Sequence, residues 1–269
     1  MAAIDDLQQL ADESPRAFLS ALTKALPGSE WHAGGQISWY LTGVPVAGFN
    51  GVAAIRPGDD VEAMLASVLR QFRGRKVPCL IHLRPSDPPE IATILSNWGL
   101  KAQEPAAPVL AVAPEALRAV PGPDGLAVYE VENEISLESW QQTYARSIGL
   151  SAGFRWHASV YARTGIGPGS AFRLLIAWRE GRPVGTAMVF LDGPAGAIYH
   201  LATVPEARGI GVGLALASQA AALVHREGRR WALLHSSKLS APLYGQLGFE
   251  PATTSTPYLY HPQPAKRRP

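Results

Sequence analysis

From residue 126 onward, apolar positions follow the strand period and the helix period in turn. Short apolar runs bounded by turn residues predict strands, and longer stretches with apolar residues every three or four positions predict helices. The expected strands are Leu126–Val131, Phe172–Trp178, Pro183–Leu191, Ala197–Val204, Trp231–His235 and one ending near Tyr260, and the expected helices begin near Asn133, Gly211 and Pro242. Hairpins followed by a loop, a helix and a strand predict a mixed sheet, and therefore an α/β fold (α+β with a mixed sheet).

The first half of the chain carries a weaker form of the same pattern. Its expected strands are Gln36–Leu41, Phe49–Ile55 and Val77–Leu83, and its expected helices are Val61–Phe72 and Pro88–Trp98. The stretch Glu104–Gly125 is rich in Pro and Gly, which favours a linker that contains one short extended run, Val109–Val112. We expect a domain boundary near Pro121–Asp124, with domains over residues 1–122 and 123–262 and a disordered basic tail over 263–269.

Composition limits the possible classes of protein. The chain has 269 residues, which is enough for two domains, and 47% of them are hydrophobic, which allows sizeable cores. A formal charge of +2 gives no strong attraction to nucleic acid or to a membrane surface. The sequence shows no apolar run long enough to span a membrane and no signal-peptide pattern, so we expect a cytoplasmic protein. The single cysteine excludes an intrachain disulfide, and the histidine spacing favours no metal site.

The clearest candidate site is the stretch Val204–Leu214, which lies between an expected strand and an expected helix. Gly209, Gly211 and Gly213 leave the backbone bare, so their N–H groups could approach a phosphate closely at the positive end of the helix dipole. Arg208 adds a positive charge beside them. The pattern predicts a cradle for a pyrophosphate.

Two common phosphate-binding motifs do not fit these residues. A P-loop requires Gly-Lys-Ser or Gly-Lys-Thr at the helix start, whereas Leu214 follows Gly213 here. A dinucleotide fingerprint requires a third glycine where this chain has Leu214 or Leu216. Glu227 stands at a distance suited to the acidic residue of that fingerprint, but the expected strand order around it is not that of a dinucleotide-binding fold.

Two motifs in sequence order carry a resemblance to a known family. Arg208–Gly213 reads Arg-x-x-Gly-x-Gly, and Tyr244–Phe249 reads Tyr-x-x-Leu-Gly-Phe. Together they resemble the acyl-CoA loop and the later tyrosine helix of the GNAT N-acetyltransferase superfamily. The resemblance implies a GNAT fold for residues 123–262 and the transfer of an acetyl group from acetyl-CoA to an amine. The acceptor would be a small molecule or a peptide, with no nucleic acid and no membrane as partner.

The first half resembles a degenerate copy of the same domain. Leu80–His82 parallels Leu233–His235, and Asn97–Leu100 parallels Gln246–Phe249. At the position of the cradle, however, Arg56–Asp60 offers one glycine beside two carboxylates, which would repel a pyrophosphate. We therefore expect a tandem arrangement in which residues 1–122 bind no cofactor. An unrelated α/β cap is the alternative.

The family resemblance also implies roles for individual residues. The cofactor arm would lie along Ala202, Thr203 and Val204, with the Ala202 amide polarising the thioester carbonyl. The pyrophosphate would lie on Arg208, Gly209, Ile210, Gly211, Val212, Gly213 and Leu214. Ser237 stands where the family often has an asparagine that binds the arm, and serine would do so less well.

The catalytic side chains are less constrained by the sequence. The resemblance implies that Tyr244 protonates or hydrogen-bonds the leaving sulfur. A base must also take a proton from the amine, and His235 and His200 are the candidates, with His235 preferred. Cys79 lies in an apolar strand of the first half, which disfavours an acyl-cysteine route. Two alternatives stay open: an acyl-CoA sensor without turnover, and an enzyme that transfers an aminoacyl or succinyl group.

Overall fold

The computed structural model describes residues 4–103, 106–149, 163–236 and 240–262. Contacts between Cα atoms divide the chain into two compact units. Unit 1 comprises residues 1–14 and 108–252, and unit 2 comprises residues 15–107 and 253–269. The predicted Ser237 site and the predicted tail at 263–269 lie outside the described residues.

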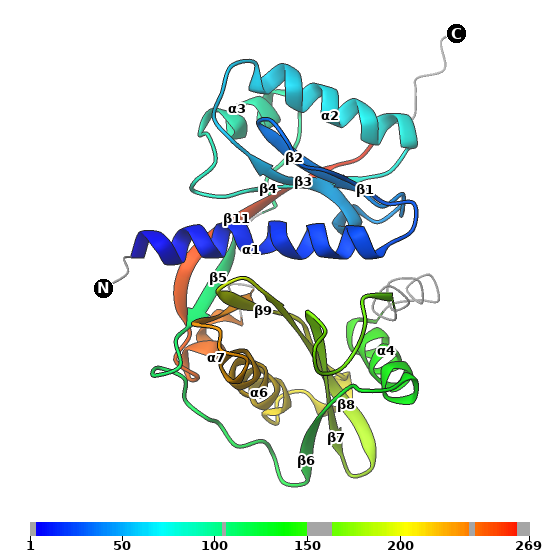
Figure 1. The fold of residues 1–269 in the computed structure, drawn as a ribbon, viewed down its shortest axis with the longest axis vertical. Coiled ribbons are helices and arrows are strands. Elements are labelled where there is room, and N and C mark those ends of the chain that lie inside the picture. Colours follow the sequence, from blue (N-terminus) through cyan, green and yellow to red (C-terminus); the bar gives the residue numbers. More distant parts are fainter. Residues whose placement is uncertain (1–3, 104–105, 150–162, 237–239, 263–269) are drawn as a thin grey trace. The chain divides into compact units, whose positions relative to one another are not determined.

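Unit 1 contains one mixed sheet with the strand order β5-β10-β9-β8-β7-β6 (Figure 1). These strands are β5 (Ala107–Val112), β6 (Leu126–Glu130), β7 (Phe172–Arg179), β8 (Arg182–Asp192), β9 (Ala195–Thr203) and β10 (Trp231–His235). Its helices are α4 (Glu134–Ile148), α6 (Val212–Arg226) and α7 (Ala241–Gly245), together with a 3-10 turn, η3 (Pro205–Ala207). Strands β9 and β10 run parallel, and the other neighbours in this sheet run antiparallel.

In unit 2 the strands lie in the order β1-β2-β3-β4-β11. Its strands are β1 (Glu30–His32), β2 (Ile37–Leu41), β3 (Asn50–Ile55), β4 (Cys79–Leu83) and β11 (Glu250–Tyr260). Its helices are α2 (Val61–Arg75), α3 (Glu90–Asn97) and a 3-10 turn, η1 (Ala47–Phe49). Helix α1 (Ile4–Ala25) begins in unit 1 and passes into unit 2 near Pro15. The mixed α/β class predicted from the apolar pattern is confirmed in both units.

The two units do not follow the division predicted at residues 122 and 123. Strand β5 comes from the first half of the chain but pairs with β10, and β11 comes from the second half but pairs with β4. Each unit thus contains a strand from the other half of the sequence. The segment interpreted as a linker contains β5, because its apolar run Val109–Val112 is needed as a buried strand in unit 1.

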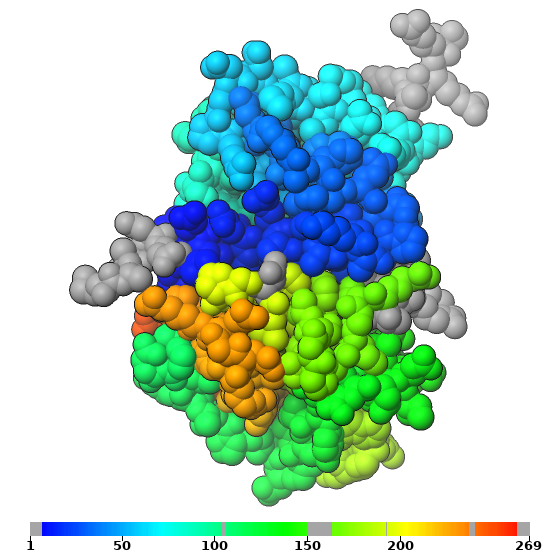
Figure 2. All heavy atoms as spheres, in the orientation of Figure 1, coloured from blue at the N-terminus to red at the C-terminus, as the bar shows by residue number. Residues whose placement is uncertain are grey.

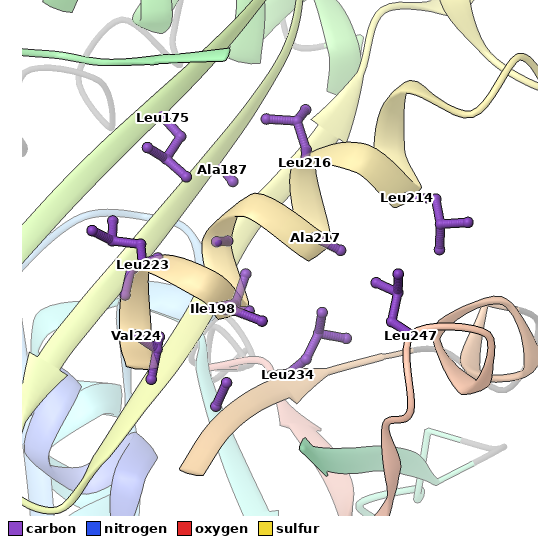
Figure 3. Close-up of a cluster of buried hydrophobic side chains, with 14 of the residues drawn as sticks. Leu175, Ala187, Ile198, Leu214, Leu216, Ala217, Leu223, Val224, Leu234 and Leu247 are labelled. Atoms are coloured by element: carbon purple, nitrogen blue, oxygen red, sulfur yellow. The ribbon is translucent and has the colours of Figure 1, made fainter. Parts of the chain in front are cut away.

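The core of unit 1 forms between the sheet and α6. Figure 3 shows Leu216 and Leu223 of this helix among Leu175, Ile198 and Leu234 of the strands. Helix α6 is rich in Ala and Leu, and most of its side chains are buried, which lets it lie close to the strands. On the face that Figure 2 shows, side chains fill the spaces between the ribbons within each unit.

Several local features repeat between the halves. Helices α2 and α6 both have 15 residues, and each begins after a residue in the left-handed region, Asp60 with φ 61° and Gly211 with φ 95°. The parallel ladder of β3 and β4 ends at Val52 and Ile81, and that of β9 and β10 ends at Ile198 and Leu234. In both halves a histidine follows the last paired residue of the second strand, as the parallel of Leu80–His82 with Leu233–His235 predicts.

Candidate active site

A β-bulge in β9 shapes the site. Thr186 of β8 pairs with Ala202 and Met188 pairs with Tyr199, so His200 and Leu201 stand opposite the single residue Ala187. His200 has φ 51°, a left-handed conformation that is costly for a residue with a side chain. The Thr186 hydroxyl donates a hydrogen bond of 3.1 Å to the His200 carbonyl and helps to hold this conformation.

Helix α4 is fixed to the bulge by the indole of Trp140. A bulge breaks the regular ladder and leaves a backbone group without its strand partner. The Trp140 Nε1 donates to the Ala187 carbonyl at 3.1 Å, and the whole residue is buried. The helix itself starts with a capping box between Asn133 and Ser136, which agrees with the start predicted at Asn133. Trp140 therefore satisfies a buried acceptor and sets the position of α4 on β8.

One turn further along α4, Tyr144 contacts the bulge residue itself. Its hydroxyl lies 2.7 Å from Nδ1 of His200, and its ring stacks on Trp140 with 5.4 Å between centroids. Burial raises the pKa of Tyr144 to about 12, so its phenol is protonated at neutral pH. The apolar face of this helix thus includes two residues, Trp140 and Tyr144, that also make polar contacts.

Beyond the bulge a cavity opens where two strands separate. Ile198 and Leu234 are the last pair in the ladder of β9 and β10, although β9 continues along β8 to Thr203. The cavity has a volume of about 330 Å³. Its walls are formed by Tyr144, Ile148, Ile198, Tyr199, His200, Leu201, Ala202, Leu234, His235, Ser236, Ser240 and Tyr244. The predicted residues Ala202, His235 and Tyr244, and the alternative His200, therefore lie around one cavity.

Tyr244 reaches this cavity from the short helix α7. It is half-buried, it packs on the core of unit 1, and burial raises the pKa of its phenol. The backbone carbonyl of Tyr244 accepts from Phe249 N at 3.3 Å, and Gly248 at φ 87° completes this turn. A Cβ atom at Gly248 would lie 2.1 Å from the Ala116 carbonyl oxygen, so the Leu-Gly-Phe motif requires glycine there.

His235 lies at the end of β10, and its ring stacks on that of Tyr199 with 5.5 Å between centroids. Both rings line the cavity, and Tyr199 also packs beside a small core that includes Ala11 of α1 and Leu233 of β10. His200 contacts α4 instead, through Tyr144. The two candidate bases therefore belong to different strands and approach the cavity from different neighbours.

The glycine loop has the backbone form that a phosphate site requires. Gly209 has φ 77° and Gly211 has φ 95°, and a Cβ atom at Gly209 would meet nothing within 4 Å, so the loop is open there. Gly211 makes no side-chain cap and α6 has no acidic residue in its first turn. The side chains of Val212 and Leu214 are buried in the core, which fixes the first turn of α6. The N–H groups of that turn have no acceptor within the helix.

Gly213 and Arg208 of the loop also lie against neighbouring elements. A Cβ atom on Gly213 would lie 3.4 Å from Thr203 Oγ1, so this glycine permits close packing of α6 on β9. Arg208 donates from Nε to the Thr203 carbonyl at 3.1 Å and from Nη2 to the Ser147 carbonyl at 2.7 Å. Its guanidinium therefore ties the end of β9 to the end of α4 while it stands beside the loop.

Glu227, at the exposed end of α6, has a structural contact. It accepts a hydrogen bond of 2.7 Å from Nη1 of Arg173, whose guanidinium also binds Glu130 of β6. Arg173 is 5% exposed, so the two carboxylates compensate a buried charge. Glu227 thus belongs to an ion pair network and does not contribute to a nucleotide site.

The matching region of unit 2 differs at each of these points. Asp60 replaces the glycine at the helix start, Asp59 precedes it, and Glu62 lies in the first turn of α2. Just beyond the last parallel pair, Nη1 of Arg84 donates to the Ala53 carbonyl at 3.0 Å. Leu95, fully buried in the core, accepts from Leu100 N at the backbone position where Tyr244 accepts from Phe249 N.

The bulge, Trp140 and Tyr144 were not identified as site elements from the sequence. The helical spacing places Trp140 and Tyr144 on one face of α4, but only the strand register shows which carbonyl and which histidine they contact. Among the described residues, no group of three or more His, Cys, Asp or Glu side chains could hold a metal ion. No described helix is long and apolar enough to cross a membrane.

A family model matches part of the chain. Residues 170–251 match the model of the acetyltransferase (GNAT) domain. No curated protein sequence matches the chain. A solved GCN5-related N-acetyltransferase from Kribbella flavida is 19% identical, with a TM-score of 0.74 over 96% of this chain and 97% of that chain. A tandem GNAT protein from the clavulanic acid biosynthesis pathway, solved without AcCoA, is 16% identical, with a TM-score of 0.59 over 95% and 97%. A GCN5-related N-acetyltransferase from Sphaerobacter thermophilus is 16% identical, with a TM-score of 0.61 over 80% and 73%.

Proposed function

Since the chain carries a GNAT acetyltransferase domain and has the fold of GNAT proteins, tandem ones included, we propose that it is an N-acetyltransferase. It uses acetyl-CoA as a substrate and acetylates a primary amine by direct attack within a ternary complex. The amine nitrogen forms a bond to the thioester carbonyl carbon, and the carbon–sulfur bond breaks. The amine loses one proton and the sulfur of CoA gains one, so the reaction balances without another reactant.

The observation that carries this proposal is the pairing of an open glycine loop with a cavity at the end of the same strand. The loop from Arg208 to Leu214 presents backbone N–H groups at the start of α6, which suits the pyrophosphate of CoA. Ala202, Thr203 and Val204 connect this loop to the cavity, so the arm of the substrate follows them toward the thioester site. The Ala202 amide then polarises the carbonyl.

Two side chains of the cavity wall carry the proton transfers. Burial raises the pKa of Tyr244, so its phenol keeps its proton and serves as a hydrogen-bond donor to the leaving sulfur. His235 accepts the proton that the amine loses, and its ring is held by the stacking contact with Tyr199. The predicted contact of Ser237 with the cofactor arm lies outside the described residues.

The first half of the chain is, in this proposal, a degenerate GNAT copy that binds no CoA. Its cradle position carries Asp59, Asp60 and Glu62, which repel a pyrophosphate at the helix start. Arg84 donates a hydrogen bond to the Ala53 carbonyl beyond the last strand pair, and Leu95 stands at the position that corresponds to Tyr244. Catalysis belongs to unit 1, which contains the glycine loop and Tyr244.

A matched pair of substitutions at Gly211 tests the cofactor site. Asp and Asn have nearly the same shape and both tolerate the left-handed conformation, so Gly211→Asp and Gly211→Asn differ mainly in charge. Asp60 already adopts this conformation at the start of α2. We expect Gly211→Asp to weaken CoA binding, measured by calorimetry, at least about tenfold more than Gly211→Asn, because a carboxylate opposes the pyrophosphate. Equal affinities for the two variants, both folded by circular dichroism, would contradict the assignment.

Turnover separates an enzyme from a sensor. Release of free CoA from acetyl-CoA is measured with a thiol reagent over a panel of amines. An amine-dependent release supports the transferase. Tight binding of acetyl-CoA with no release for any amine would favour an acyl-CoA sensor, and release from succinyl-CoA alone would change the acyl group of the proposal.

A further inference from the structure

The wall of the cavity holds no charged side chain among the residues that the structure describes. It consists of aliphatic residues, three phenols (Tyr144, Tyr199 and Tyr244), the imidazoles His200 and His235, and two serine hydroxyls. Residues 150–162 and 237–239, which the structure does not describe, contain neither Asp nor Glu in their sequences. A negative side chain that could receive a cationic amine is therefore missing from this described wall.

Acids on these elements and near them in the chain lie elsewhere. Glu134 and Glu138 of α4 are exposed, and Glu138 accepts a hydrogen bond of 3.0 Å from Gln142. Glu206, three residues after the end of β9, binds Arg146 of α4 and is exposed. Asp12 of α1 is buried, but it is not one of the residues of the cavity wall. Burial raises the pKa values of Tyr144 and Tyr244, so these phenols stay neutral and supply no negative charge. Protonation of either histidine would add positive charge to the wall.

An alkylamine would enter this cavity at a disadvantage. With a pKa near that of lysine, only about one molecule in 10³ is neutral at pH 7.5. Moving the charged form from water into a wall without a carboxylate leaves its charge unpaired, and the desolvation penalty is large. An aromatic amine avoids both penalties, because delocalisation of its nitrogen lone pair into the ring keeps it neutral at physiological pH. Its flat ring also suits a wall that presents Tyr144, Tyr199 and His200.

We propose that the acceptor is a weakly basic, ring-bearing amine of the arylamine class that enters the cavity in its neutral form. The inference rests on the proposed function and narrows its acceptor. The neutral nitrogen attacks the thioester carbon directly, the carbon–sulfur bond breaks, and the nitrogen gives up one proton only as the new bond forms. His235 takes that proton, while Tyr244 provides a hydrogen bond to the sulfur, which leaves as the thiol once it is protonated.

The test compares aniline with cyclohexylamine, two ring amines of similar size that differ in basicity. Release of CoA is measured from pH 6.5 to pH 9 with the full chain and saturating acetyl-CoA. We expect kcat/KM at pH 7 to be at least 100-fold higher for aniline, and the value for cyclohexylamine to rise about tenfold per pH unit as its neutral form increases. Cyclohexylamine or an alkyl diamine used as well as aniline at pH 7 would overturn the inference.

A substitution on the cavity wall provides a second test. Ile148 ends α4, lines the cavity and is 40% exposed, so a polar side chain there leaves the fold intact. Ile148→Glu supplies the missing carboxylate, and Ile148→Gln is the matched neutral control. We expect Ile148→Glu to raise kcat/KM for cyclohexylamine about tenfold without raising it for aniline, and Ile148→Gln to do neither. The same response of both amines to both variants would contradict the inference.

Different results would contradict the proposed function and the inference about the acceptor. If the proposed function is wrong, the protein will not bind acetyl-CoA or will release no CoA with any amine. Failure of the acceptor inference alone appears as efficient CoA release with alkylamines in a protein whose acetyl-CoA binding is intact.

Discussion

At the scale of single residues, the two halves of the chain differ at a few matching positions. Gly211 corresponds to Asp60 at a helix start, and Tyr244 corresponds to Leu95 at a helix end. The backbone is similar in each case, and in the proposed function the side chain decides whether a phosphate or a leaving sulfur is accommodated. Both differences are readable in the sequence once the two halves are aligned.

Replacement of the tyrosine tests its proposed role. Tyr244→Phe keeps the ring that packs on the core of unit 1 and removes only the hydroxyl. We expect kcat to fall about 10²-fold, in the range of a lost acid contact, while the dissociation constant for acetyl-CoA changes less than threefold. Tyr129→Phe, at a tyrosine that is 58% exposed on β6, serves as the control. Unchanged kcat in Tyr244→Phe would remove this residue from the mechanism.

At the scale of elements, the bulge in β9 and helix α4 are connected by specific contacts. The bulge redirects His200 toward Tyr144, and Trp140 satisfies the carbonyl opposite the bulge. Loss of that one hydrogen bond would leave a buried acceptor without compensation, at a cost of about 1–3 kcal/mol. The position of α4 and the shape of the cavity wall therefore depend on a contact outside the cavity.

Trp140→Phe measures this dependence. The phenyl ring fills part of the space but cannot donate to the Ala187 carbonyl. We expect the free energy of unfolding in urea to fall by about 2–4 kcal/mol, from the lost donor and the smaller ring together. Trp178→Phe on β7, where the indole is only half-buried, is the matched control and should lose less than half as much. Equal losses in the two variants would show that the hydrogen bond has no special weight.

The sequence predicts the elements of this site better than their contacts. The glycine loop, the strand before it and the tyrosine helix follow from local spacing, since glycines and apolar periods act over a few residues. The bulge depends on the register between β8 and β9, which no local signal fixes. For the same reason the face of α4 indicates burial at Trp140 but not the carbonyl that it satisfies.

At the scale of the whole molecule, each of the two units contains a strand from the other half of the sequence. Strand β5 pairs with β10 in unit 1, and β11 pairs with β4 in unit 2. A domain boundary predicted from composition falls in the proline-rich stretch after β5. It therefore does not reveal that the two halves of the sequence exchange strands. Pairing between strands that lie far apart in the chain leaves no sign in the local sequence.

Cutting the chain at residue 122 tests the exchange. The fragment 1–122 retains β5 but lacks the β11 that pairs with β4, and the fragment 123–269 lacks β5. We expect neither fragment alone to unfold cooperatively in urea, whereas the two together should recover a cooperative transition. The intact chain with a protease site inserted at residue 122, cleaved after folding, is the control. Cooperative unfolding of fragment 123–269 by itself would contradict the interdependence.

The exchanged strands also impose an order on synthesis at the ribosome. When residues 79–83 emerge, the strand that will pair with them in antiparallel fashion lies about 170 residues further along and has not been translated. An unpaired, apolar strand edge is a site of aggregation. A newly made chain therefore keeps this edge exposed until residues 256–260 are released, and a chaperone that covers it during translation should increase the yield of folded protein.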